Sequence, residues 1–385
     1  MKDYTQDCYK EAIKVLKANS TKFGVLASGK SAKAKGRSYR SVFGRDASIS
    51  SMGMVLSKDK ILLTAARHSL ETLAKYQADN GQIAFWVKPE KKEADFYYTG
   101  SIDSTLWWLI AIKFFDKNTK QSLSKKFSKQ IKKAINWLEC QEHPNFHLLS
   151  QNETSDWADL MPRTGFVLYS NSLWYWVKRM YNLNKADQTK EYFNYIFDRA
   201  STPSKKVFKE NTRLEKLLSH IKKNKKDPSY LSFVNYTFYG TEGDVFGNIL
   251  ACLVGLADDK KTEEVIDYLL AQNANKPHPI KATLRPINRK DNIWRPYMYH
   301  LKLNKVNEYH NGGIWPFIGG FWVMLLNIFD QEISHEALNN LAKLNKQNNW
   351  QFNEWFHGKN GKAMGMPQQS WNAAMYIVAY KSLNN

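Results

Sequence analysis

The 385-residue sequence has little cysteine, and its few cysteines follow no recognisable pattern. Cys8, Cys140 and Cys252 are scattered, with neither the spacing of a metal site nor that of a disulfide framework. Structural disulfides belong to oxidising compartments, so this usage favours a reducing one. We therefore expect no metal and no cofactor.

Long apolar runs are also missing. No stretch reaches the length of a membrane span, and residues 1–7 lack the apolar core of a signal peptide. From these two absences we expect a cytoplasmic protein with no membrane partner.

Acidic residues are scarce relative to basic ones. The chain has 36 Asp and Glu against 56 Lys and Arg, which gives a formal net charge of +20. That balance would suit a nucleic-acid-binding protein. Much of the lysine excess, however, falls on expected outer helices and on residues 205–226, and no nucleic-acid-binding fold signature is found. Nucleic acid therefore stays an alternative partner, which a salt titration of binding would test.

Aromatic residues are abundant. They make up 14% of the chain, including 13 Trp, 20 Tyr and 20 Phe. A large hydrophobic core explains most of them. Trp and Tyr faces also pack on the C–H faces of pyranose rings, so a sugar-binding cleft is a second explanation.

Hydrophobic residues recur with helical periodicity, and convincing strand alternation is rare. The helices that this periodicity predicts cover residues 4–16, 47–56, 61–76, 102–115, 123–140, 166–180, 188–197, 245–257, 262–271, 315–329, 335–344 and 369–380.

Six of these helices are apolar on nearly all sides, which is typical of buried helices. They begin near residues 46, 103, 165, 244, 315 and 370, most are followed by an amphipathic helix, and each is preceded by a loop rich in glycine, acid, amide or aromatic residues. This order predicts an all-α fold, an (α/α)6 toroid in which six inner helices present their N-terminal loops at one end. We find no linker, so we expect one catalytic domain over residues 1–385 with a basic insertion around 203–232. The long segment 273–307 should wall the cleft.

The most unusual loop is residues 152–165, which we call the acid loop. It holds Asp156, Trp157, Asp159 and Arg163 and leads directly into an apolar helix. Carboxylates at the edge of the protein interior have shifted pKa values. Asp159, next to Trp157 and two apolar residues, is our candidate proton donor of a glycoside hydrolase. Helix capping is the alternative role for both aspartates.

A second carboxylate is needed for hydrolysis with inversion, because one group protonates the leaving oxygen and the other activates water. Glu354 lies among aromatic residues in the loop 353–369, which we call the base loop. It is our candidate base, and an exposed loop glutamate is the alternative.

Other loops offer ligands for sugar hydroxyls. Arg45 and Asp46 place a donor beside an acceptor, although an ion pair closing a helix is equally consistent. Asp103 could bind hydroxyls or cap its helix. In residues 309–316, paired glycines let the backbone approach a ligand, and His310 and Trp315 offer a donor and a platform.

Residues 155–163 resemble the acid loop of the (α/α)6 glycosidases of the trehalase, processing α-glucosidase and amylo-α-1,6-glucosidase type. In those families the acid stands four residues before an arginine, which implies Asp159 before Arg163. Residues 354–357 with Gly361 are similar to their base loop. Residues 102–108 and 310–316 look most like neutral or alkaline invertases. The resemblance runs from about Phe43 to Tyr376.

The resemblance implies a role for each motif. Asp159 would be the acid and Glu354 the base of an inverting reaction, and Arg45, Asp46, Asp103, Trp107 and His310 would hold the nonreducing sugar. The full set of expected substrate-binding residues is Arg45, Asp46, Asp103, Trp107, Asp156, Trp157, Arg163, His310, Asn311, Trp315, Trp355 and Trp371.

The sequence departs from trehalases at Ser155 and Asp156, where those enzymes have Ser-Gly before the tryptophan. Whether Asp156 or Asp159 is the acid therefore stays open. We predict a hydrolase of a short α-glycoside, with an oligosaccharide or small glycoside as its partner. The alternatives are a neutral-invertase-like sucrose hydrolase and a non-catalytic carbohydrate- or nucleic-acid-binding protein. The sequence predicts neither the sugar nor the oligomeric state.

Overall fold

The computed structural model describes residues 3–29, 39, 41–96, 101–201, 212–222 and 227–384. Within these residues, six helices are apolar and almost wholly buried, and they begin where the sequence predicts. They are α3 (Gly44–Leu56), α5 (Ile102–Asn118), α8 (Leu168–Tyr181), α11 (Val245–Leu253), α13 (Pro316–Phe329) and α15 (Ser370–Leu383).

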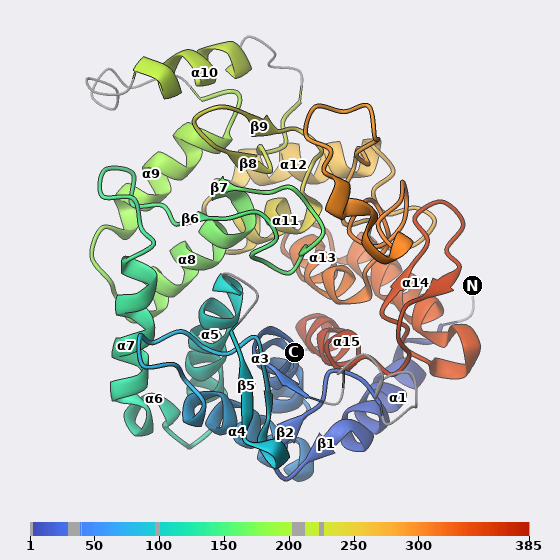
Figure 1. Ribbon diagram of the computed structural model, residues 1–385. Helices are drawn as coiled ribbons and strands as arrows, with labels where there is room; N and C mark the ends of the chain where they lie inside the picture. Colours follow the sequence, from blue (N-terminus) through green and yellow to red (C-terminus); the bar gives the residue numbers. More distant parts are fainter. Residues whose placement is uncertain are drawn as a thin grey trace.

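These six helices contact one another in a closed ring. Neighbours in the ring are also neighbours in the chain, in the order α3, α5, α8, α11, α13 and α15, and α15 returns to pack on α3 (Figure 1). A helix in such a ring meets other protein on every side, which is why its sequence shows no polar face.

A second set of helices packs outside the ring, one beside each inner helix. Their exposed faces are polar and their buried faces apolar, as expected for helices that cover a core. They are α1 (Thr5–Asn19), α4 (Lys60–Lys75), α7 (Ser128–Glu139), α9 (Ala186–Phe197), α12 (Asp259–Ala271) and α14 (Gln331–Trp350). The first of them, α1, packs against the last inner helix, α15 (Figure 1).

Short strands interrupt the helical pattern, which the sequence analysis did not predict. In the described residues they form four antiparallel sheets, with strand orders β1-β2, β3-β4-β5, β6-β7-β8-β9 and β10-β11. The strands are β1 (Ser20–Thr21), β2 (Gly24–Val25), β3 (Val42–Phe43), β4 (Trp86–Lys88), β5 (Glu93–Asp95), β6 (Ser150–Gln151), β7 (Gly165–Val167), β8 (Phe233–Val234), β9 (Tyr239–Gly240), β10 (Trp355–Phe356) and β11 (Ala363–Met364). Strands of two or three residues are too short to show a period of two.

Two helical predictions need correction. The helix expected over 123–140 is divided into α6 (Leu123–Lys126) and α7, and the helix expected over 245–257 ends at Leu253. The basic insertion around 203–232 is described at residues 212–222 and 227–232. Its helix α10 (Thr212–Lys222) is not fully solvated, because Leu214, Leu218 and Ile221 are buried. The segment 273–307 contains the 3-10 helix η2 (Pro296–Lys302), and a second one, η1 (Pro89–Lys91), lies between β4 and β5.

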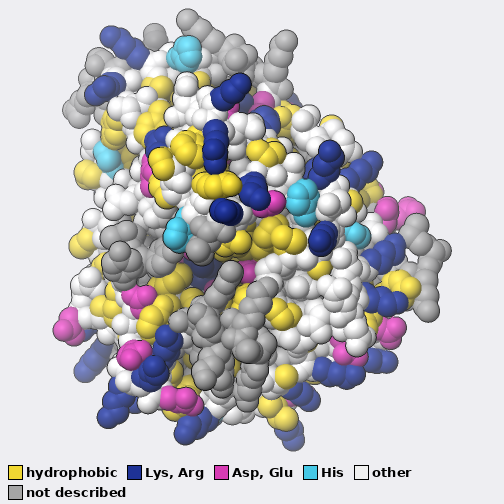
Figure 2. All heavy atoms as spheres, turned by 45° about the vertical axis from the view of Figure 1, so that its right-hand side comes forward, with side chains coloured by type: hydrophobic (Ala, Val, Ile, Leu, Met, Phe, Trp, Pro, Cys, Tyr) yellow, Lys and Arg dark blue, Asp and Glu magenta, His cyan; other side chains and the backbone are white. Residues whose placement is uncertain are grey.

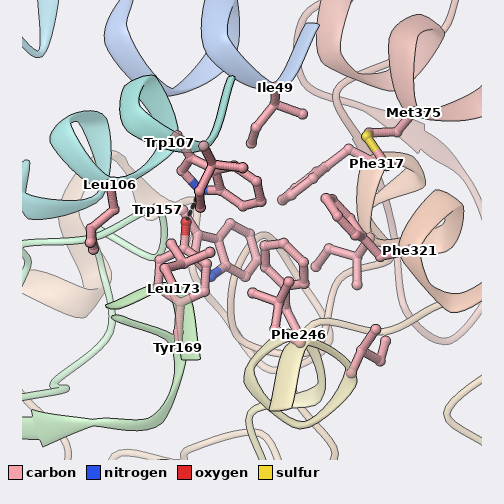
Figure 3. Packing of buried hydrophobic residues seen from close by; sticks show 14 of the residues in the cluster. Ile49, Leu106, Trp107, Trp157, Tyr169, Leu173, Phe246, Phe317, Phe321 and Met375 are labelled. Atoms are coloured by element: carbon pink, nitrogen blue, oxygen red, sulfur yellow. Dashed lines mark hydrogen bonds between the residues drawn. The ribbon is translucent and has the colours of Figure 1, made fainter. Parts of the chain in front are cut away.

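Aromatic side chains fill the centre of the ring. Trp107, Phe246 and Phe321 come from three different inner helices and meet with ring centroids 5.1 to 5.8 Å apart (Figure 3). Such edge and tilted contacts between large rings stabilise a core beyond the area they bury. The abundance of aromatic residues in the sequence is therefore in large part a property of this core.

Candidate active site

The loops that precede the inner helices surround one cavity of about 360 Å³. Its described lining residues come from five of these loops or first turns and from the segment 273–307: Tyr39, Phe43, Arg45, Asp46, Phe85, Trp86, Trp157, Asp159, Leu303, His310, Trp315, Glu354 and Trp371. Eight of the predicted site residues are among them. The cavity has the size of a pocket for a small ligand.

Asp159 reaches the cavity from the acid loop, and 20% of its side chain is exposed. Burial raises the pKa of this carboxyl to about 7. The positive charge of Arg45 opposes the shift, and the negative charges of Asp156 and Glu354 add to it. Within the described residues, the Asp159 carboxyl accepts no hydrogen bond. It is therefore a carboxyl that holds a proton near neutral pH.

Glu354 lies in the base loop, where its backbone N–H donates to the carbonyl of Met366. Its carboxylate accepts a hydrogen bond from the Tyr39 hydroxyl at 2.6 Å and one from the Met366 N–H at 3.0 Å. Burial and then the charge of Glu354 raise the pKa of Tyr39 well above its usual range, so the phenol keeps its proton. Donors directed at a carboxylate favour its ionised form.

Arg45 and Asp46 open helix α3, and both line the cavity. Arg45 donates from Nη1 to both carboxylate oxygens of Asp103, at 3.1 and 2.9 Å. Burial alone would lower the pKa of Arg45, but the charges of Asp103 and Asp46 raise it, so the guanidinium stays protonated. Burial raises the pKa of Asp46 to about 6. The Arg45 guanidinium is thus a cation beside the Asp46 carboxyl, and this pair can bind sugar hydroxyls.

Asp103 and Trp107 were both predicted to bind substrate. Neither residue lines the cavity, and both are fully buried. The Trp107 indole N–H donates to the Tyr169 hydroxyl at 2.7 Å (Figure 3). That hydroxyl donates to Asp103 at 3.1 Å. Asp103 therefore holds Arg45 in place, and Trp107 supports Asp103 through the Tyr169 hydroxyl.

Asp156 does not reach the cavity either, contrary to its predicted role in substrate binding. Its two carboxylate oxygens accept hydrogen bonds from the Ala158 N–H at 2.8 Å and from the Gln151 amide at 2.9 Å. The side chain fixes the turn that carries Asp159. Of the two aspartates left open by the sequence, only Asp159 faces the cavity.

Arg163 was predicted to contact substrate but is buried away from the cavity. Its guanidinium lies 3.1 Å from Asp244 and 3.6 Å from Glu242, in the loop before α11. Burial raises the pKa of Asp244 to about 6 although Arg163 opposes the shift. Arg163 therefore ties the acid loop to the next loop in the ring.

Asn311 and Trp355 were also predicted to bind substrate, and neither is part of the cavity lining. Asn311 bridges the backbone N–H and carbonyl of Ile287, at 2.7 and 2.9 Å. Trp355 is buried in β10 beside Tyr309, with ring centroids 5.9 Å apart. Each of them directly follows a lining residue in the sequence, Asn311 after His310 and Trp355 after Glu354. The motifs alone therefore predicted that they would contact the substrate.

The remaining predicted residues form an aromatic surface of the cavity. Trp315 makes edge-on contacts with Trp157 and with Trp371, and the His310 ring stacks on Trp315 with ring centroids 5.2 Å apart. Burial lowers the pKa of His310 well below its usual range, and the charges of Arg163 and Arg45 lower it further. The imidazole is therefore neutral. Its Nδ1 lies 3.8 Å from the Asp159 carboxyl.

Five lining residues were missed by the sequence analysis: Tyr39, Phe43, Phe85, Trp86 and Leu303. Tyr39 is the most important of them, because its hydroxyl donates a hydrogen bond to Glu354. The two residues are 315 positions apart in the chain. A contact of that separation leaves no local pattern. Leu303 belongs to the segment 273–307, and its presence agrees with the expectation that this segment walls the cleft.

Two comparisons with known proteins bear on this site. The family model described as alkaline and neutral invertase matches residues 236–385. That segment contains Glu354 and His310 but not Asp159. No curated protein sequence matches the chain significantly.

Several solved structures with a similar fold are glycosidases, at low sequence identity. The mannosylglycerate hydrolase of glycoside hydrolase family 63 from Thermus thermophilus, in complex with Tris and D-glycerate, has a TM-score of 0.69 and 10% identity, with 96% of this chain and 99% of that chain covered. A glycosidase variant in complex with glucose has a TM-score of 0.62 and 9% identity, with 99% and 97% covered. An α-amylase from Clostridium perfringens has a TM-score of 0.59 and 13% identity, with 97% of both chains covered.

Both comparisons point to glycoside hydrolases. They confirm the resemblance predicted from the motifs and, with it, the expectation that this helix-rich chain is a glycosidase. Within the residues that the structure describes, no cluster of His, Cys, Asp or Glu is arranged to hold a metal ion. Nor is any helix in the described ranges long and apolar enough to cross a membrane.

Proposed function

We propose that the protein is an inverting glycoside hydrolase with an (α/α)6 toroid fold, that it acts on a short α-glycoside, and that Asp159 is the acid and Glu354 the base. The observation that carries the proposal is the cavity they share, where one carboxyl holds a proton and the other accepts two hydrogen bonds. Acid–base hydrolysis needs this difference between its two carboxyls.

The positions of the two loops in the ring support inversion. Asp159 precedes the third inner helix in chain order, α8, and Glu354 precedes the sixth, α15. In a closed ring of six, the third and sixth members are opposite each other. Carboxyls from opposite loops leave room for a water between sugar and base, and inverting enzymes separate them by roughly 6.5–9.5 Å for this purpose.

In the proposed reaction, Asp159 donates its proton to the glycosidic oxygen as the bond from that oxygen to the anomeric carbon breaks. Glu354 accepts a proton from a water on the opposite face of the sugar ring, and the oxygen of that water bonds to the anomeric carbon. Tyr39 keeps Glu354 ionised and oriented. The sugar leaves with inverted configuration, Asp159 ends ionised, Glu354 ends protonated, and exchange with solvent restores both.

Arg45 and Asp46 would hold hydroxyls of the sugar, and Trp157, Trp315 and Trp371 would cover its apolar face. Two neighbours of low identity were solved with glucose bound, which makes a glucoside the first substrate to test. His310 is neutral and would act as a hydrogen-bond partner rather than as a charge.

A sucrose hydrolase is the second candidate function. It is favoured by the match of residues 236–385 to the model of alkaline and neutral invertases. This candidate keeps the same acid and base, so it differs only in the leaving group.

A panel of α-linked disaccharides that includes sucrose, and of short glucosides, tests both candidates. Proton NMR of the first turnovers should show one product anomer of configuration opposite to that of the substrate. A product of retained configuration would refute the inverting mechanism, and hydrolysis of sucrose alone would select the second candidate. If no glycoside is hydrolysed by the native chain, the proposed function is wrong.

A further inference from the structure

A second cavity, of about 740 Å³, opens in the segment 273–307. Its described lining residues are Ile287, Asn288, Arg289, Lys290, Asp291, Trp294, Met298, Tyr299, Asn304, Lys305 and Val306. This segment is drawn in orange at the upper right of Figure 1, beside the loops of the candidate active site. None of the sequence motifs accounts for this cavity.

The second cavity is next to the first one. Leu303 lines the active-site cavity, and the following residue, Asn304, lines the second cavity. The buried Asn304 amide donates to the carbonyl of Leu160 at 2.9 Å, directly after Asp159. The two cavities are therefore adjacent at residues 303 and 304, close to the acid loop that carries Asp159.

The Arg289 side chain is held by aromatic rings. Its guanidinium carbon lies 4.4 Å from the centroid of Tyr299 and 5.9 Å from that of Trp294. Such cation–π contacts orient a guanidinium without using its N–H donors. Within the described residues, Arg289 makes no ion pair and donates no hydrogen bond. Arg289 is exposed, so its planar set of donors is oriented by the two rings and accessible to an anion.

The charges around the cavity have mostly one sign. Arg289, Lys290 and Lys305 are cationic, and Asp291 is the acidic residue in the lining. The Asp291 carboxylate already accepts the Asn288 N–H at 2.7 Å. In the upper part of Figure 2, Lys and Arg side chains lie among hydrophobic ones on this face. The cavity thus offers an anion an excess of positive charge and little competition.

We propose that the second cavity binds an anionic group, a phosphate or a carboxylate, on the leaving group of the substrate. The proposal rests on the proposed function for the identity of the substrate, but not for the binding of the anion. A neutral oligosaccharide fits less well, because stacking on Tyr299 or Trp294 would displace the guanidinium that lies over these rings. Arginine binds both phosphate and carboxylate through two parallel N–H donors.

The first test measures binding alone, in the Asp159→Asn variant, in which the proposed reaction should be strongly slowed. Inorganic phosphate, D-glycerate and neutral glycerol are titrated by calorimetry. The anions should bind and glycerol should not, and the tighter anion identifies the source. Adding Arg289→Gln should weaken anion binding about tenfold, since a charged hydrogen-bonded pair is lost. The matched control Lys132→Gln, on the outer helix α7, removes the same charge elsewhere and should change nothing.

The second test uses pairs of glycosides that differ only by a phosphate or carboxylate on the leaving group. The native chain should prefer the anionic member in kcat/KM, and Arg289→Gln should lower that preference about tenfold. Equal anion binding with and without Arg289, or a preference for neutral glycosides, overturns the inference while the proposed function stands. Arg289-dependent anion binding without hydrolysis of any glycoside supports the anion site and refutes the proposed function.

Discussion

The acid loop and the base loop each bring one carboxyl to the same cavity, and the two carboxyls are held in opposite ways. Glu354 accepts hydrogen bonds from Tyr39 and Met366, and it is almost fully buried. Asp159 accepts none within the described residues, and it is partly exposed to the cavity. The acid loop directs its polar contacts to Asp156 instead.

This difference explains how one cavity can hold both an acid and a base. Donors stabilise a carboxylate, and burial without donors stabilises a protonated carboxyl. Asp156 stabilises the turn that positions Asp159, but this turn places no hydrogen-bond donor on the Asp159 carboxyl within the described residues. Two aspartates three residues apart thus differ: Asp156 is hydrogen-bonded within its loop, and Asp159, the proposed acid, faces the cavity.

Removing either proposed catalytic carboxyl should have the largest effect. Asp159→Asn and Glu354→Gln should each lower kcat by about 10²–10⁴-fold on a natural glycoside. A glycosyl fluoride separates them, because fluoride leaves without protonation. With this substrate Asp159→Asn should regain most of its rate and Glu354→Gln should not. Steady-state kinetics on both substrates makes the comparison, and rescue of the wrong variant would reverse the two roles.

Tyr39→Phe should have the next largest effect. It removes the phenol that donates to Glu354 and keeps the ring, so kcat should fall about tenfold while KM changes little. The loss should appear equally with glycosyl fluoride, because Tyr39 acts on the base side. The matched control is Tyr297→Phe, whose hydroxyl donates to Glu153 and not to a proposed catalytic group. A similar loss in both variants would argue against a specific role for Tyr39.

The pH profile should report the protonated state of Asp159. Since this carboxyl has a pKa of about 7 and must carry a proton, kcat/KM should fall as the pH rises above about 7. Asp156→Asn removes a negative charge that raises this pKa, so the alkaline limb should move to lower pH while most of the maximal rate remains. Loss of the limb in Asp156→Asn would identify Asp156 as the acid.

The smallest effect expected is on stability. The folded pKa of Asp159 is about 7 and its ordinary value is 3.8, so its contribution to stability is present below the ordinary value and is lost as the pH rises through about 7. Asp159→Asn removes that loss. Its Tm should exceed that of the native chain by roughly 1–2 °C near pH 8, and by less near pH 5. A lower Tm at both pH values would contradict this account.

Sequence patterns predicted the positions of the inner helices well. A helix that is buried on all sides must be apolar on all sides, and the six apolar runs follow this rule. The starting loops were predictable for the same reason, since polar residues next to such runs lie at the ends of the core. Asp159, Glu354, Arg45 and Asp46 were found in this way.

Direct contact with the cavity was harder to predict. Trp107, Asp156 and Arg163 stand in the right motifs, but their side chains point into the protein. Position along the chain does not report the direction of a side chain in an irregular loop. Tyr39 was missed for the converse reason, because the partner that gives it a function is far away in the sequence.

The ring closes where α1 and α3 meet α15, and this joins the beginning of the described chain to its end. Asn19 donates to Ser370, and Tyr39 donates to Glu354. During synthesis, Asp159 therefore emerges from the ribosome well before Glu354 and α15. A truncated product that stops before α15 would expose apolar helices and have no hydrolytic activity, so quality control and catalytic competence depend on the same late event.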